Sequence, residues 1–345
     1  MHKADGSGWL KVEAHAVPIL LLLVLSAAWS KDAIAVDTSQ VLVLEREIPL
    51  DRVSGRIDHM AIDLERRHLA VAELGNNTVD LIDLNNSRVL NRISGLDEPQ
   101  GIAFVPSSDL FAVASGGDGS VKLFKGSDLS PVGVINLGDD ADNIQLNRAA
   151  GHIVVGYGQG GLAVIDPITH SKLADVALQA HPEGFQLSSD GSRAFVNVPD
   201  ARQIASVDLS SGNQVATWKT AELRSNFPMA IDGSEEMLAI AFRDPPRLAL
   251  FDAQNGAITA DVETCDDSDD VFFDDRRARI YVSCGAGAVD VFEHSDGGLR
   301  RVAQVKTYSG ARTSLFVPEL DRLFVASRSS LLGNDAKILL FRPSP

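Results

Sequence analysis

The sequence predicts an all-β protein, and three observations carry that prediction. An apolar segment preceded by a polar or charged position recurs every 41 to 44 residues. Two further apolar segments of strand length follow each copy. Gly-, Asn- and Asp-rich turns such as "GNN", "GDG" and "GAG" separate them and suit hairpin connections. A multi-stranded unit repeated at this period is the pattern of a β-propeller.

The first strand of the repeat occurs seven times, which sets the number of blades. The copies read "HMAID", "GIAFV", "NIQLN", "GFQLS", "PMAID", "DVFFD" and "TSLFV". Second strands such as "HLAVAEL" and third strands such as "TVDLIDL" follow. A more polar fourth strand, as in "SRVLNRIS", closes most repeats and suits a solvent-facing edge. We therefore predict a seven-bladed β-propeller with four-stranded antiparallel blades.

The two ends of the chain indicate how the ring closes. The last repeat stops after its third strand, at Phe341, and a lone strand spans Val41–Glu47. We expect this N-terminal strand to complete the last blade, so that residues 36–345 form a single propeller domain.

The N-terminal residues 1–35 have the features of a signal peptide. Lys3 and Lys11 precede the apolar run Ala16–Ala28, and small residues follow at Ala33–Ala35. The run is short for a bilayer span. We expect cleavage near Val36, a periplasmic or secreted protein, and no membrane span after cleavage. An uncleaved membrane anchor is the alternative.

Composition limits the classes of partner. The chain has 345 residues, of which 45% are hydrophobic and 23% are charged, which is ample for a core. The formal net charge of −16 repels phosphate backbones, so we expect no nucleic-acid partner. We expect a monomer whose partner is a small molecule or another protein.

Polar positions just before the first strands predict a site at one mouth of the propeller channel. In register they are Asp58, Gln100, Asp142, Glu183, Phe227, Asp269 and Arg312, and the next positions add His59, Asn143, Asp270 and Thr313. His181 and Asn226 directly precede this register, and second-strand ends add Glu73, Tyr157, Asn197, Arg243 and Arg328. The candidate ligand-binding residues are Asp58, His59, Gln100, Asp142, Asn143, Glu183, Asp269 and Arg312.

These residue types indicate some ligands and exclude others. Clustered acids with Asn and His are compatible with a divalent cation, whereas Arg312 suits a carboxylated ligand. Propeller channels also hold water, so polar residues there need no ligand. No cofactor is firmly implied. The sequence contains no C-x-x-C-H motif for haem and no repeated Gly–Trp pattern for pyrroloquinoline quinone.

Cys265 and Cys284 are the two cysteines of the chain, and both fall at the mouth end of the sixth repeat. In an oxidising compartment such a pair can form a disulfide. Two free thiols are the alternative.

The chain resembles the secreted bacterial YVTN or YncE-like seven-bladed propellers. The segments that carry the resemblance include "DHMAID", "EPQGIAF", "NFPMAID" and "GARTSLFVPELDRLFVA", and it covers about residues 41–342. The "YVTN" tetrapeptide is degenerate here; "FVNVPD" and "YVSCG" are its nearest forms. The resemblance implies the fold and export, but no single chemistry.

Three functions remain open from the sequence. The leading hypothesis is an exported binding module that engages a ligand or partner protein at the channel mouth, since no G-x-S-x-G, H-E-x-x-H or Walker motif is present. The second is a lactonase-type enzyme that uses His59, Asp142, Glu183 and Arg312. The third is a structural scaffold. Because catalytic motifs are missing, a role without catalysis is preferred, and if the chain is an enzyme we expect the lactonase type.

Overall fold

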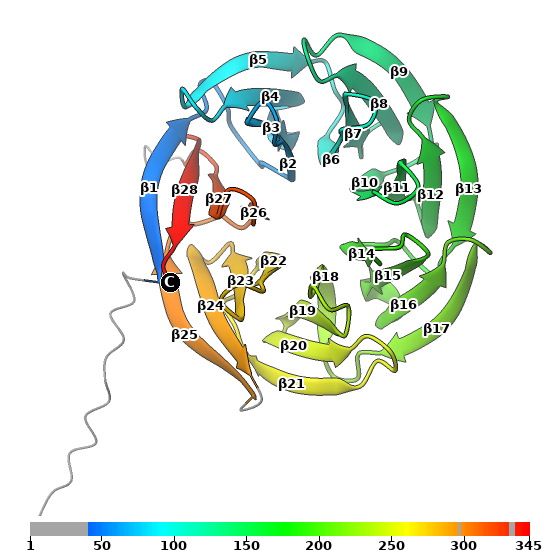
Figure 1. Cartoon of the computed structure of the whole chain (residues 1–345), viewed down its shortest axis with the longest axis vertical. Coiled ribbons are helices and arrows are strands. Elements are labelled where there is room, and N and C mark those ends of the chain that lie inside the picture. Colours follow the sequence, from blue (N-terminus) through cyan, green and yellow to red (C-terminus); the bar gives the residue numbers. More distant parts are fainter. Residues whose placement is uncertain (1–40, 296–297, 331–334) are drawn as a thin grey trace, which may run out of the picture. The chain divides into compact units, whose positions relative to one another are not determined.

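The computed structural model describes residues 41–295, 298–330 and 335–345. In these residues the chain forms seven four-stranded antiparallel sheets, which stand as blades around a common axis (Figure 1). The described residues belong to one compact unit. The predicted seven-bladed β-propeller is confirmed. The predicted signal peptide, residues 1–35, lies outside the described residues, as does the expected cleavage point.

The strands take the same place in every blade. The innermost strands are β2 (Met60–Asp63), β6 (Pro99–Val105), β10 (Ala141–Asn147), β14 (Phe185–Leu187), β18 (Arg224–Ile231), β22 (Ser268–Asp274) and β26 (Ser314–Val317). The second strands are β3 (His68–Glu73), β7 (Leu110–Ser115), β11 (His152–Tyr157), β15 (Arg193–Val198), β19 (Met237–Asp244), β23 (Arg279–Cys284) and β27 (Arg322–Ser327).

The outer half of each blade follows the same order. The third strands are β4 (Thr78–Asp83), β8 (Ser120–Lys125), β12 (Gly161–Asp166), β16 (Gln203–Asp208), β20 (Pro246–Asp252), β24 (Ala288–Ser295) and β28 (Lys337–Pro343). The rim strands are β5 (Arg88–Ser94), β9 (Pro131–Asn136), β13 (Ser171–Ala177), β17 (Asn213–Lys219), β21 (Ile258–Glu263), β25 (Gly298–Lys306) and β1 (Leu42–Pro49). The short 3₁₀ turns η2 (Leu74–Asn76) and η3 (Pro199–Ala201) join second to third strands. Within the described ranges, no helix is long and apolar enough to cross a membrane.

The N-terminal strand closes the ring, as expected. The seventh sheet has the order β1-β28-β27-β26, and β1 pairs antiparallel with β28 from Leu42↔Pro343 to Pro49↔Lys337. The strand runs to Pro49, two residues beyond the end expected from its apolar alternation. Figure 1 shows β1 on the rim beside β28, the two ends of the described chain joined in one blade.

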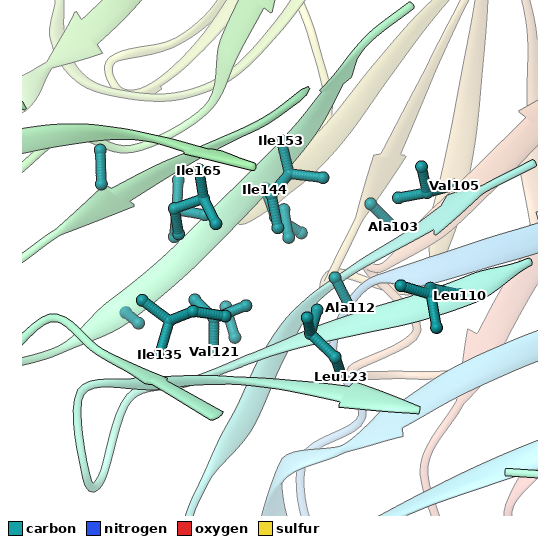
Figure 2. Close-up of a cluster of buried hydrophobic side chains, with 14 residues drawn as sticks. Ala103, Val105, Leu110, Ala112, Val121, Leu123, Ile135, Ile144, Ile153 and Ile165 are labelled. Atoms are coloured by element: carbon teal, nitrogen blue, oxygen red, sulfur yellow. The ribbon is translucent and has the colours of Figure 1, made fainter. Parts of the chain in front are cut away.

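The hydrophobic core is divided among the interfaces between neighbouring blades. The cluster between the second and third blades, drawn in Figure 2, combines Ala112 and Leu123 of one blade with Ile144, Ile153 and Ile165 of the next. Equivalent buried clusters lie between the other neighbouring blades. Each Val, Leu, Ile or Phe side chain buried there contributes roughly 1.5–3 kcal/mol. The blades are therefore held in place by packing against both neighbours.

Ion pairs at the turns between first and second strands tie neighbouring blades together at the end of the channel opposite the candidate site. Arg66 of the first blade contacts Asp63 of its own turn and Asp109 of the second blade, at 2.6 and 2.7 Å. Arg277 of the sixth blade contacts Asp321 of the seventh at 2.8 Å. The recurrence follows from the sequence repeat, because both Arg residues occupy the same turn.

Candidate functional site

The candidate positions lie where the innermost strands begin, at one mouth of the channel. In four blades the strand register shifts at this point, between Pro99 and Ile102, Ala141 and Ile144, Asn226 and Met229, and Ser268 and Asp270. Such β-bulges leave residues outside the ladder and re-aim their side chains. In the other three blades the register position lies two residues before the first residue of the strand. The predicted register positions therefore lie outside the paired part of the innermost strands.

A cavity of about 340 Å³ occupies the channel. It is lined by five of the eight candidate residues, which come from four blades: His59, Asp142, Asn143, Glu183 and Asp269. The repeat spacing thus brings together side chains that are more than 40 residues apart in the sequence. Gln145, Gln186 and Phe227 also line the cavity.

The other three candidates are not among the lining residues. Asp58 is fully buried and lies behind His59, with Oδ1 2.8 Å from His59 Nδ1. Gln100 donates its amide to Asp140 Oδ1 at 3.4 Å, across to the entrance of the next blade. Arg312 contacts Asp267 and Asp269 at 2.8 and 3.1 Å. Repeat spacing places these residues at the mouth but does not determine their side-chain directions.

Asp58 supports the charge of His59. Arg56 Nη2 lies 2.7 Å from Asp58 Oδ2. Burial opposes the charged form of Asp58, but His59 and Arg56 hold the pKa of this carboxyl below its usual range. Burial likewise opposes the charged form of His59, yet Asp58, with Asp270 and Asp142 farther off, raises its pKa to about 10. At neutral pH the first blade therefore presents an imidazolium to the cavity.

Two acidic residues and one histidine of the third and fourth blades form another part of the mouth. Ligand atoms of Asp142, His181 and Glu183 lie within 4.8 Å of one another. His181 Nδ1 is 2.6 Å from the carbonyl oxygen of Gly158, and its Nε2 is 3.7 Å from Asp142 Oδ2. The interaction with Asp142 raises the pKa of His181 to about 9. Burial, followed by the charge of Asp142, raises the pKa of Glu183 to about 8.

A second charged group lies between the fifth and seventh blades. Arg243 contacts Asp269 and donates to the Ser268 carbonyl at 2.7 Å. Its guanidinium carbon lies 4.1 Å from the centre of the Phe227 ring, a cation–π distance. Arg312 pairs with Asp269 from the other side. Asp269 is therefore shared by two guanidinium groups, which compensate its negative charge.

The structure adds residues that the sequence analysis did not select for the site. Arg243 and His181 were expected at this face of the propeller but were not among the candidate ligand-binding residues. Arg56 was not expected at all, because it lies in the loop before the first repeat. Asp270 carries a pKa raised to about 8 by burial and accepts the Ser314 backbone N–H at 2.6 Å. For His181 and Asp270 the available signal was their place next to the register, beside Glu183 and Asp269.

Several second-strand ends that were expected at this face do not contribute to the cavity. Glu73 is buried within the first blade. Tyr157 hydrogen-bonds Asp175 of the rim strand β13 at 2.8 Å. Asn197 is buried and donates to the Phe227 carbonyl at 3.1 Å, which ties the fourth blade to the fifth. These three side chains have structural partners.

Cys265 and Cys284 form a disulfide in the structure, with their Cα atoms 5.9 Å apart. Cys284 ends β23, and Cys265 lies in the segment that leads into β22 of the same blade. The bridge fastens the segment that carries Asp267 and leads into β22, the strand of Asp269, to the second strand.

Comparisons with known proteins show the fold alone. No family model matches the sequence, and no curated protein does. A chain in the crystal structure of the mitotic checkpoint complex superimposes with a TM-score of 0.77 at 14% identity, covering 96% of this chain and 100% of that one. A chain of hydrazine synthase from Kuenenia stuttgartiensis gives a TM-score of 0.71 at 14% identity, covering 84% and 97%. This chain is a seven-bladed β-propeller.

Proposed function

We propose that this propeller is an exported binding module that holds a small polar ligand in the cavity at the channel mouth. The observation that carries the proposal is the convergence of His59, Asp142, Asn143 and Glu183 from three blades on one 340 Å³ cavity. Small-molecule sites typically measure about 300–1,000 Å³ and contain a few convergent polar groups. The cavity volume favours a small ligand over a bulky segment of a partner protein.

Membership of the YVTN or YncE-like propellers and export to the periplasm or medium are part of the same proposal. The resemblance of the repeat segments supports the family. The Cys265–Cys284 disulfide supports export, because disulfides persist in oxidising compartments.

A binding role is preferred over a lactonase role because of Arg312. A lactonase of the kind considered above needs a guanidinium that can grip the substrate's carboxyl group. The Arg312 side chain is already paired with Asp267 and Asp269. Its charge is therefore largely satisfied within the protein.

Native mass spectrometry of the full chain, recovered from an oxidising compartment, tests the proposal. We expect a co-purified small molecule on the wild-type protein. Asn143→Leu removes one polar lining group at similar volume and should lose that species. Asn213→Leu, on the exposed rim strand β17, is the matched control and should retain it.

Wild-type protein without any bound species, and without thermal stabilisation by the small-molecule fraction of the host's extract, would contradict the proposal. The scaffold hypothesis would then be the better one. Equal retention by Asn143→Leu and Asn213→Leu would place the ligand outside the cavity.

A further inference from the structure

Three potential metal ligands meet at the entrance of the third and fourth blades. Asp142 stands on the β-bulge of β10, while His181 and Glu183 come from the segment that leads into β14. Their nitrogen and oxygen atoms lie within 4.8 Å of one another. These distances are short enough for side-chain rotation to bring all three onto one ion.

The orientation of His181 is set by a group outside the cluster. Its Nδ1 is 2.6 Å from the carbonyl oxygen of Gly158. Since a carbonyl can only accept, Nδ1 carries the proton in that hydrogen bond. The lone pair of the neutral ring is then on Nε2, the nitrogen that faces Asp142 at 3.7 Å. A metal-binding histidine typically donates its other ring N–H to a backbone carbonyl or carboxylate in this way.

Neither carboxyl group accepts a hydrogen bond from the described residues. Asp142 is only 8% exposed and lines the cavity, and its nearest polar partner is His181 at 3.7 Å, longer than a hydrogen bond. Glu183 also lines the cavity, and its carboxyl group makes neither a hydrogen bond nor an ion pair within the described part of the chain. Desolvated carboxylates without donors are costly, and a bound cation would offset that cost.

The nearby guanidinium groups do not provide this compensation. Arg243 and Arg312 are both held by the acidic residues of the sixth blade, Asp267 and Asp269. No guanidinium group is therefore paired with Asp142 or Glu183 in the described residues, so the oxygen atoms of these two side chains remain available to a ligand.

We propose that Asp142, His181 and Glu183 bind a divalent first-row transition metal ion, represented by Zn²⁺. One imidazole with two carboxylates is a set of ligands that suits Zn²⁺ and leaves a coordination position for water or a small molecule. Ca²⁺ and Mg²⁺ prefer oxygen ligands alone. This inference deepens the proposed function and rests on it, because it identifies a ligand for the same cavity.

Titration of the full chain, stripped with a chelator, tests the metal site. We expect one equivalent of Zn²⁺ by isothermal titration calorimetry, and Co²⁺ should give the absorption bands of an ion bound by nitrogen and oxygen. We expect Zn²⁺ binding to weaken by at least about tenfold in each of three variants: Asp142→Asn, His181→Gln and Glu183→Gln. Even the loss of a residue that only hydrogen-bonds a metal ligand lowers metal affinity by about this factor.

Matched controls separate this site from general charge effects. Asp139→Asn removes the same charge from an exposed neighbour of the cluster, and His152→Gln removes an imidazole from the far end of the third blade. Both should bind Zn²⁺ like the wild type. Thermal melting of each variant shows whether it is folded. The Co²⁺ spectrum of the wild-type protein tests the site even if a variant fails to fold.

Several outcomes would overturn the metal inference: no stoichiometric Zn²⁺ or Co²⁺ binding, equal affinity in the three ligand variants, or Ca²⁺ binding as tightly as Zn²⁺. If Zn²⁺ fails to bind while an organic molecule co-purifies and is lost in Asn143→Leu, the metal inference fails and the binding function stands. If neither is found, both fail.

Discussion

At the scale of single residues, the channel mouth separates charges that have partners in the protein from charges that do not. Asp58 is buried against His59 and Arg56, and Asp269 is shared by Arg243 and Arg312. These groups are paired with guanidinium groups or with His59, whereas Asp142 faces only the His181 imidazole, at 3.7 Å, and the Glu183 carboxyl accepts no hydrogen bond in the described residues. A ligand that carries positive charge therefore gains most where the third and fourth blades meet.

A carboxyl away from the cavity should make stability depend on pH. Glu73 ends β3 and is fully buried; it accepts the Thr78 hydroxyl, while the nearest guanidinium, that of Arg92, lies 3.9 Å away and is engaged with Asp80. Burial, together with the charge of Asp80, raises the pKa of Glu73 from 4.5 to about 8. The folded protein therefore holds a proton that the unfolded chain loses above about pH 4.5.

Stability from this group should be complete below about pH 4.5 and should fall as the pH rises towards 8. Glu73→Gln keeps a neutral side chain at every pH, so it should flatten the decline of unfolding free energy across that range. Denaturant unfolding at several pH values measures both slopes. Glu222→Gln, an exposed residue, should keep the wild-type slope. A Glu73→Gln slope equal to the wild type's would show that Glu73 is ionised in the folded protein.

The repeat spacing predicted which residues lie at the channel mouth but not where their side chains point. Positions in register were predictable because a propeller rotates equivalent residues around one axis, and four of the seven line the cavity: Asp142, Glu183, Phe227 and Asp269. Side-chain direction was not predictable, since Asp58 and Arg312 occupy the same register and pair with protein groups instead. Arg56 lies in a loop that the repeat does not include, so periodicity carried no signal for it.

At the scale of elements, β1 does more than complete the rim of one blade. Its pairing with β28 completes the seventh sheet. Leu42 packs into the cluster between the sixth and seventh blades, and Ile48 packs into the cluster between the seventh and first. One strand therefore supports two interfaces of the ring.

This arrangement predicts unequal effects of two substitutions on the same strand. Ile48 is completely buried, whereas Leu44 is 46% exposed. Ile48→Ala should lower the unfolding free energy by about 2–5 kcal/mol, as is usual for large-to-small changes in a core. Leu44→Ala should change it by roughly 0.5 kcal/mol or less. Denaturant unfolding of both variants measures the difference. Similar losses would mean that β1 does not close the ring as a packed strand.

The strands themselves were predictable because apolar runs, turn residues and a constant period agree with one another. The predicted first, second and third strands correspond to β2, β3 and β4 and their equivalents in the other blades. The bulges at Asp142 and Asp269 were not predictable, because one extra residue in a strand leaves the apolar pattern around it unchanged.

At the scale of the whole molecule, the seven blades cooperate because the core lies between them. Each blade needs its neighbours to bury its apolar faces, so closing the ring stabilises all of them together. The same closure sets the mouth geometry, because residues of the first, third, fourth and sixth blades share one cavity only when the circle is complete.

Export is a property of the whole molecule and gives the last prediction. If residues 1–35 are a cleaved signal peptide, protein recovered from the native host should begin near Val36, and its cysteines should be oxidised. A disulfide that closes a loop of 19 residues, such as Cys265–Cys284, should contribute about 3 kcal/mol. Reduced protein, or the Cys265→Ser/Cys284→Ser variant, should therefore unfold at lower denaturant concentration.

N-terminal sequencing and thiol titration of unfolded, unreduced protein measure the two features separately. The matched control is chain residues 36–345 produced in a reducing cytoplasm, which should contain two free thiols. Native-host protein that retains residues 1–35 and has two free thiols would contradict export. Retained residues with an intact disulfide would instead favour an uncleaved anchor facing an oxidising compartment, because the bridge reports the compartment and the N-terminus reports the processing.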